Sequence, residues 1–152
     1  MSIKSDIESL LQEGVKQQHF PGAQYMVVYR SGETITGFVG NKQTEPLKIS
    51  LTGDEVYDVA SLTKVISTTT MVMKFIENKQ LSLHTKVVEM LPNFKHMDIN
   101  VYHLLTHTSG LPADIPKAYT LKNKDDVLTN VFEAQLLNPV GTKIVYSDIG
   151  FI

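Results

Sequence analysis

Cysteine is absent from this 152-residue chain. Its absence excludes disulfide bonds, thiol nucleophiles and zinc sites built on cysteine ligands. A basic run is missing as well, because the 14 Lys and Arg residues are spread among 16 Asp and Glu residues. The charge pattern therefore gives no indication of a nucleic-acid-binding protein.

Long apolar segments are also missing. The N-terminus, MSIKSDIESLLQEGVKQQ, lacks the apolar core of about 7 to 15 residues that a signal peptide needs. No segment approaches the roughly 18 apolar residues of a membrane-spanning helix. With 42% hydrophobic residues, 20% charged residues and a net charge of -2, the composition is typical of a soluble globular domain. We expect no membrane span and, by default, a cytoplasmic location.

The first third of the chain predicts one helix and one hairpin. Apolar residues recur at helical spacing near the N-terminus and follow a capping-box pattern, Ser5 with Glu8, which predicts a helix over residues 3–18. Residues 23–40 contain two runs rich in β-branched and aromatic residues, separated by the turn pair Ser31-Gly32. We therefore expect a β-hairpin.

The remainder of the chain has a mostly helical pattern. The β-branched residues of segment 65–79 would suit a strand, but its length and apolar spacing favour a largely buried helix. Shorter helices are predicted at 83–91, 101–107 and 124–137, the second with Asn100 as its N-cap. We expect six apolar side chains of this region to lie in the core: Val65, Met71, Val72, Met73, Ile76 and Met90.

This order of elements predicts an α+β fold, in which an antiparallel sheet is flanked by helices and accompanied by a mostly helical region. The helix and the hairpin occupy residues 1–53. The mostly helical part occupies residues 54–152.

The pair Ser61 and Lys64 indicates nucleophilic chemistry. Residues three apart lie on one face of a helix, so the lysine amine can reach the serine hydroxyl. A serine hydroxyl is a weak nucleophile until a neighbouring base takes its proton, and lysine is a base only when it is neutral. Burial and the positive end of the helix dipole would both lower the lysine pKa. The alternative interpretation is an N-cap serine followed by a solvated lysine.

Three segments in order resemble the serine β-lactamase and penicillin-binding protein superfamily. They are SLTK at Ser61, LLTHTSGLP at 104–112 and VGTKIVYSDIGF at 140–151. S-x-x-K is a signature of these enzymes. The closest resemblance is to the class C β-lactamase, D-aminopeptidase and esterase-like branch. It implies a β-lactamase/transpeptidase-like fold, classed as α/β in some schemes, and a hydrolase without metal or organic cofactor. It also implies a small-molecule or peptide-like acyl substrate.

The resemblance also assigns roles to residues. It makes Ser61 the nucleophile that forms an acyl-enzyme, Lys64 its activating partner, and Tyr146 a phenol that shuttles a proton. Whether lysine or tyrosine is the base stays open, because their titrations would be coupled. Asp148 lies at a substrate-binding position where the family commonly has Asn. A carboxylate offers only acceptors and a negative charge, so it would hold Lys64 protonated and favour Tyr146 as base.

The family's third motif, Lys-Thr-Gly or His-x-Gly, does not occur in this sequence. The chain ends at YSDIGFI, where a new apolar run begins. We therefore expect residues 1–152 to be the N-terminal portion of one β-lactamase-like domain. Two alternatives to an active hydrolase stay open: a noncatalytic penicillin-recognising sensor or binding module, and an inactive fragment of a hydrolase. A structural domain with coincidental motifs is a third.

His103 and His107 are four residues apart on one predicted helix, a spacing that can bind zinc. No HExxH glutamate separates them and no third ligand is evident, so no metal site is predicted. The hydroxyls of LLTHTSGLP and His107 are expected to fasten a helix end and a turn, with Gly110 releasing the backbone.

Overall fold

The computed structural model describes residues 2–152. These residues form two compact units, divided between Asp58 and Val59. Each unit has its own secondary structure, so the two are described separately.

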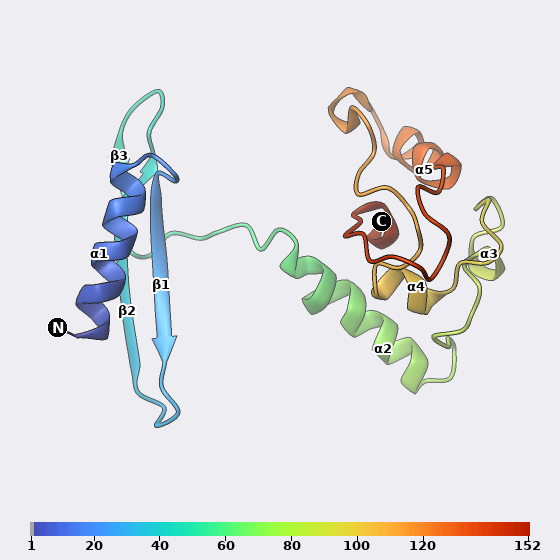
Figure 1. Cartoon of the computed structure of the whole chain (residues 1–152), viewed down its shortest axis with the longest axis horizontal. Helices are drawn as coiled ribbons and strands as arrows, with labels where there is room; N and C mark the ends of the chain where they lie inside the picture. The colour runs from blue at the N-terminus through green and yellow to red at the C-terminus, as the bar shows by residue number, and fades with distance from the viewer. Residues whose placement is uncertain (1) are drawn as a thin grey trace. The chain divides into compact units, whose positions relative to one another are not determined.

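The first unit is a helix packed on a small antiparallel sheet (Figure 1). Helix α1 (Ile3–Lys16) precedes strands β1 (Gly22–Val28), β2 (Thr34–Gln43) and β3 (Ile49–Ser50), and the strand order is β1-β2-β3. β1 and β2 pair over their full facing lengths, which confirms the predicted hairpin. Side chains alternate between the two faces of a strand, so this register determines which side chains face α1.

Two details of the first unit differ from expectation. The N-cap of α1 is Ser2, and Ser5 is the third helical residue of the capping box, so the prediction that Ser5 pairs with Glu8 is wrong. The Ser5 amide donates to Ser2 Oγ at 3.2 Å, and the Ser2 amide donates to Ser5 Oγ at 3.0 Å. Glu8 instead accepts a hydrogen bond from the Tyr25 hydroxyl at 3.2 Å, which links α1 to β1. Strand β3 was not predicted, because its two residues show no alternating pattern.

The second unit is helical. A π-helix, η1 (Lys64–Thr69), continues into α2 (Thr70–Glu77). This confirms the helix predicted for segment 65–79, for which the β-branched residues would also have suited a strand. The later helices are confirmed but shorter than predicted: α3 (Val87–Met90), α4 (Val101–Leu105) and α5 (Lys124–Glu133), with 3₁₀ turns η2 (Ala118–Thr120) and η3 (Ile149–Phe151). Asn100 is the N-cap of α4, as predicted, and its side chain accepts from the His103 amide at 3.1 Å.

The core of the second unit comes from α3, α5, η3 and the loops between them. Its buried cluster comprises Val87, Phe94, Ile99, Leu111, Ile115, Val131 and Ile149. The expectation that three methionines fill the core is wrong, since Met71, Met73 and Met90 are 51%, 64% and 47% exposed. Val65 is likewise 58% exposed. All seven side chains of the buried cluster come from segments other than α2. Helix α2 itself has no buried residue.

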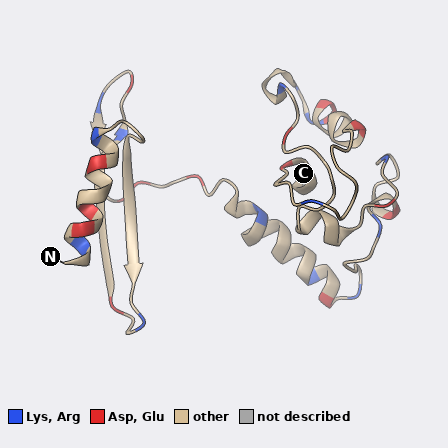
Figure 2. Ribbon diagram, in the orientation of Figure 1, with Lys and Arg blue, Asp and Glu red and all other residues tan. Residues whose placement is uncertain are grey.

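Charged residues of both signs are interspersed along the elements of each unit (Figure 2). Asp125 and Asp126 lie in the first turn of α5, where they complement the positive end of the helix dipole. No helix within residues 2–152 combines the length and the apolar character needed to cross a bilayer.

Candidate active site

Ser61 lies in a tight turn that leads into η1. The Leu62 amide donates to the Val59 carbonyl at 2.9 Å, and the Lys64 amide donates to the Ser61 carbonyl at 3.1 Å. Ala60, directly before Ser61, has a φ of 43°, in the left-handed region. This conformation costs a residue with a Cβ about 1 to 2 kcal/mol. The strain falls beside the serine, as is common where a backbone places a reactive group.

The π-helix η1 is built on hydroxyl contacts. Thr69 Oγ1 donates to the Lys64 carbonyl at 2.7 Å, and Thr70 Oγ1 donates to the Val65 carbonyl at 3.1 Å. Each hydroxyl reaches five residues back, the spacing of a π-helix, and short π segments in α-helices are often found at functional sites. Lys64 is the first residue of η1. The wider turn of the π-helix therefore affects the direction of the Lys64 side chain.

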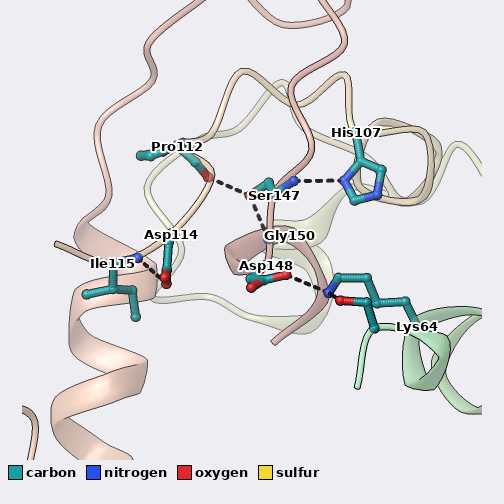
Figure 3. A network of polar contacts seen from close by, with 9 residues as sticks. Lys64, His107, Pro112, Asp114, Ile115, Ser147, Asp148 and Gly150 are labelled. Carbon is teal, nitrogen blue, oxygen red and sulfur yellow. Dashed lines mark hydrogen bonds and ion pairs between the residues drawn. The ribbon is translucent and has the colours of Figure 1, made fainter. Parts of the chain in front are cut away.

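Lys64 is the centre of a group of polar side chains. Its ammonium Nζ lies 3.3 Å from Ser61 Oγ and 2.5 Å from Asp148 Oδ1. The same nitrogen is 5.0 Å from the centroid of the Tyr146 ring and 5.9 Å from that of Phe151. Figure 3 shows the Lys64 and Asp148 side chains pointing toward one another. The structure thus brings together all four residues that the sequence singled out for the site.

Backbone contacts hold the segment that carries Tyr146 and Asp148 in place. Ser147, between them, is 1% exposed. Its hydroxyl donates to the Pro112 carbonyl at 2.6 Å and accepts from the Gly150 amide at 3.2 Å (Figure 3). The Asp148 amide donates to the Ala113 carbonyl at 2.7 Å. Ser147 is thus anchored inward, whereas its neighbour Tyr146 is 54% exposed and the side chain of its other neighbour, Asp148, is 48% exposed.

The LLTHTSGLP segment is the surface on which Ser147 is anchored. Gly110 within it has a φ of 81°, and a Cβ there would lie 2.1 Å from the Asn138 carbonyl oxygen. Only glycine fits this close approach. His107, also left-handed at 57°, accepts a hydrogen bond from the Ser147 amide at 3.1 Å through Nδ1. These contacts attach the segment to Ser147, in agreement with the expectation that it fastens a turn.

Two sequence-based expectations for the Lys64 pKa oppose each other: burial and the helix end lower it, and the Asp148 carboxylate raises it. The hydrogen bond to Asp148, and next the one to Tyr146, raise the pKa of Lys64 above its ordinary value of 10.5. Burial lowers this pKa, but by less. The expectation that burial and the helix dipole lower the Lys64 pKa is therefore wrong, whereas the raised direction agrees with the expectation that Asp148 holds Lys64 protonated, because the carboxylate stabilises the ammonium.

Tyr146 is shifted in the opposite direction. Hydrogen bonding to Ser61, and next to Lys64, lowers the pKa of Tyr146 below its ordinary value of 10.0, while burial and the Asp148 charge oppose this shift. The phenol is 54% exposed. Tyr146 is therefore the group of the site whose proton leaves more readily than in an ordinary residue of its type.

The two histidines four residues apart contact different backbone groups. His103 Nδ1 accepts from the Asn100 amide at 3.3 Å, whereas His107 Nδ1 accepts from Ser147. Within residues 2–152 there is no group of three or more His, Cys, Asp or Glu residues that could hold a metal ion.

Two members of the site were missed by sequence reasoning. Phe151 places its ring 5.1 Å from the His107 ring and near Lys64 Nζ. The left-handed Ala60 was missed as well. The GF dipeptide at the end of the third segment was a signal for Phe151, whereas no side-chain preference indicates a left-handed alanine.

Comparison with known proteins connects this geometry to a family. The model of the beta-lactamase family matches residues 7–152. Protein flp of Staphylococcus aureus is 25% identical over an alignment covering 97% of this chain and 31% of that protein. N-acetylmuramyl-L-alanine amidase of Bacillus subtilis is 29% identical, with 88% of this chain and 35% of that protein covered. The chain thus spans about a third of the length of these curated relatives.

Solved structures show the same fold. A class C beta-lactamase superposes with a TM-score of 0.76 at 26% identity, covering 97% of this chain and 41% of that chain. D-amino acid amidase from Ochrobactrum anthropi, in complex with L-phenylalanine amide, superposes with a TM-score of 0.79 at 21% identity, covering 98% of this chain and 42% of that chain. The predicted β-lactamase-like fold, with its small antiparallel sheet and helices, is confirmed.

The ion pair between Lys64 and Asp148 gives the first prediction. Replacing Asp148→Asn removes the largest cause of the raised Lys64 pKa, so this pKa should fall, as measured by NMR titration of lysine labelled with ¹³C at Cε. A raised folded-state pKa stabilises the fold below 10.5, and this stabilisation is lost as pH rises through the folded pKa. D148N should therefore unfold more easily than wild type at neutral pH, and the difference should close at strongly alkaline pH.

The matched control is Asp98→Asn, which removes an exposed carboxylate of the same unit. D98N should leave the Lys64 pKa at its wild-type value, because the charge it removes is not a cause of the shift. An equal pKa in D148N and wild type would contradict the assigned ion pair.

Proposed function

The chain belongs to the beta-lactamase family, and from this membership we propose that it carries the acylation site of a serine hydrolase. In this proposal Ser61 forms an acyl-enzyme on an ester, amide or β-lactam carbonyl. The observation that supports it most is the position of Lys64 Nζ, 3.3 Å from Ser61 Oγ and 2.5 Å from Asp148 Oδ1.

The proposed acylation begins with proton transfer. Tyr146, as the phenolate, takes the proton of the Ser61 hydroxyl while Oγ forms a bond to the carbonyl carbon. The π-electrons of the carbonyl move to its oxygen, giving a tetrahedral oxyanion. When the oxyanion collapses, the bond to the leaving group breaks and Tyr146 returns its proton to that group. Hydrolysis by water then releases the acid and restores the free serine.

Tyr146 is a better candidate for the base than Lys64. The two side chains have pKa values displaced in opposite directions, lower for the phenol and higher for the amine. Environments that separate two titratable groups in this way commonly divide their roles. Lys64 then remains a cation, because the Asp148 carboxylate stabilises its ammonium form. This cation stabilises the Tyr146 phenolate and the developing charge on Ser61 Oγ.

The comparisons support a class of small acyl substrates. The similar structures include a class C beta-lactamase and a D-amino acid amidase. The Bacillus subtilis relative is also an amidase. We therefore propose small-molecule or peptide-like esters, amides or β-lactams as substrates of this chain. A metal or organic cofactor has no part in the proposed step, since the nucleophile and the base are both side chains.

One observation favours a second candidate function. Asp148 binds Lys64 directly, and Lys64 in turn contacts Ser61. A lysine held as a cation cannot accept a proton in the hydrolysis of the acyl-enzyme. If Tyr146 does not replace it in that step, the acyl-enzyme persists. The chain would then be a penicillin-recognising sensor or binding module.

A fluorophosphonate probe tests the nucleophile. We expect one adduct on the 152-residue chain, located at Ser61 by peptide mass spectrometry, and no adduct on Ser61→Ala. The matched control is Ser67→Ala in η1, whose exposed hydroxyl lies outside the site, and it should be labelled at the wild-type rate.

A p-nitrophenyl ester then separates the two candidate functions. Continuous release of nitrophenol supports the hydrolase, and a single burst with a stable adduct supports the sensor. No adduct on the folded protein contradicts both.

The pH dependence of acylation tests the base. If Tyr146 is the base, the labelling rate of Ser61 should rise with pH through a midpoint below 10.0, because the phenolate is the active form and its pKa is lowered. A midpoint above 10.5 would assign the role to Lys64 instead, because its pKa is raised.

Tyr146→Phe should slow labelling by about 100- to 10,000-fold, the usual contribution of a general base. Tyr119→Phe, a control at a phenol that is 87% exposed, should not.

A further inference from the structure

One residue outside the proposed catalytic group contacts three consecutive residues around Tyr146. The His107 carbonyl accepts from the Val145 amide at 2.8 Å, and His107 Nδ1 accepts from the Ser147 amide at 3.1 Å. Between these two contacts, the His107 and Tyr146 rings lie with centroids 4.6 Å apart and planes inclined by 33°. His107 therefore holds the backbone on both sides of Tyr146 and lies against its ring.

The contact with Ser147 defines the protonation state of His107. An amide N–H can only donate, so Nδ1 must carry a lone pair, and the proton of the neutral ring must lie on Nε2. Figure 3 shows the Ser147 amide directed at this ring. Burial, and next the Lys64 cation, lower the pKa of His107 below 6.5, while the Asp148 carboxylate opposes them. These charges and the neighbouring phenol are compatible with a neutral imidazole at pH 7.

The backbone of His107 is unusual for a residue with a side chain. Its φ of 57° is in the left-handed region, where histidine pays a steric cost. This conformation follows directly after α4, where the His107 amide donates to the Leu104 carbonyl at 3.1 Å. The strained turn is the one whose carbonyl and ring both face the Tyr146 segment.

We propose that His107 is a positioning residue for Tyr146, and that it acts as the neutral Nε2–H tautomer through its bond to the Ser147 amide and its ring contact. This inference rests on the proposed role of Tyr146 in proton transfer. His107 does not touch the nucleophile in any contact of the described residues. Its effect on the reaction is to keep the phenol oxygen within hydrogen-bonding reach of Ser61 and Lys64.

The alternative is a histidine that only stabilises the loop. A structural role alone would leave the ionisation of Tyr146 unchanged in any variant that still folds. The positioning role makes a different prediction, because the Tyr146 pKa is lowered by hydrogen bonding to Ser61 and Lys64. If the ring and its backbone move, those hydrogen bonds lengthen and the pKa returns toward 10.0.

Two substitutions separate the contacts of His107. His107→Asn retains an acceptor oxygen near the place of Nδ1 and tolerates a left-handed backbone, but it lacks the ring. His107→Phe retains an aromatic ring and leaves the Ser147 amide, in a residue that is 1% exposed, without its acceptor. His84→Asn and His84→Phe make the same changes at an exposed histidine of the same unit.

The experiment is an NMR titration of the 152-residue chain with tyrosine labelled at Cζ, together with the fluorophosphonate labelling rate. We expect H107F to raise the Tyr146 pKa toward 10.0 and to slow labelling of Ser61 by about 100-fold, the effect of a displacement near 1 Å. H107N should restore most of both values, and the His84 variants should match wild type. In wild type, long-range ¹⁵N–¹H spectra should show the His107 proton on Nε2.

The readouts distinguish failure of this inference from failure of the proposed function. A Tyr146 pKa that is the same in wild type and in both folded His107 variants overturns the positioning role. A wild-type His107 ring that carries its proton on Nδ1 also overturns the positioning role. This measurement does not depend on the folding of any variant. A Tyr146 pKa that responds to H107F in a chain that the probe does not label supports the positioning role and contradicts the proposed acylation.

Discussion

The ion pair between Lys64 and Asp148 is the interaction on which the site depends. It joins two residues that are 84 positions apart in the sequence, at a distance of 2.5 Å. The Lys64 side chain is 14% exposed and that of Asp148 48% exposed, so solvent weakens the pair and its contribution to stability is small, as for most surface pairs. Its main effects are on geometry and charge. It fixes the lysine beside Ser61 and keeps it a cation.

The charge of Lys64 determines what the other groups can do. A permanent ammonium cannot accept the serine proton, but it stabilises a neighbouring phenolate. Tyr146 has the complementary displacement, since its pKa is lowered by Ser61 and Lys64. The loop that contains His107 adds a support for the phenol from a different segment of the chain. The proposed site is thus a coupled unit in which one aspartate sets the role of the lysine, and through it the role of the tyrosine.

Much of the fold followed from local patterns. The hairpin has alternating β-branched residues and a Ser-Gly turn, and helix α4 has Asn100 before it, so both could be predicted from neighbouring residues alone. Ser61 and Lys64 could be paired because helical spacing brings residues three apart together. Tyr146 and Asp148 came from the resemblance of the third segment, since no local rule connects them to Ser61. These four side chains do converge.

The features that were not predicted depend on contacts distant in sequence. Local rules alone indicated a lowered Lys64 pKa, and the raised direction followed only from Asp148 in a distant segment, which the family resemblance assigned to the site. The exposure of Met71 and Met73 depends on which segments form the core of the second unit. The left-handed Ala60 has no side-chain signal at all. Periodicity predicts which side chains share a face of one element, but it does not identify the partners of that face.

The convergence of the Lys64 ammonium with the Tyr146 and Phe151 rings is the most direct test of this account. Nuclear Overhauser spectra of the 152-residue chain at neutral pH can measure it without any substrate. We predict cross-peaks from the Lys64 Cε protons to the ring protons of both aromatic residues, since Nζ lies 5.0 Å and 5.9 Å from their centroids. Cross-peaks among the residues of the buried cluster, which includes Ile99 and Leu111, without any from Lys64 to either ring would contradict it.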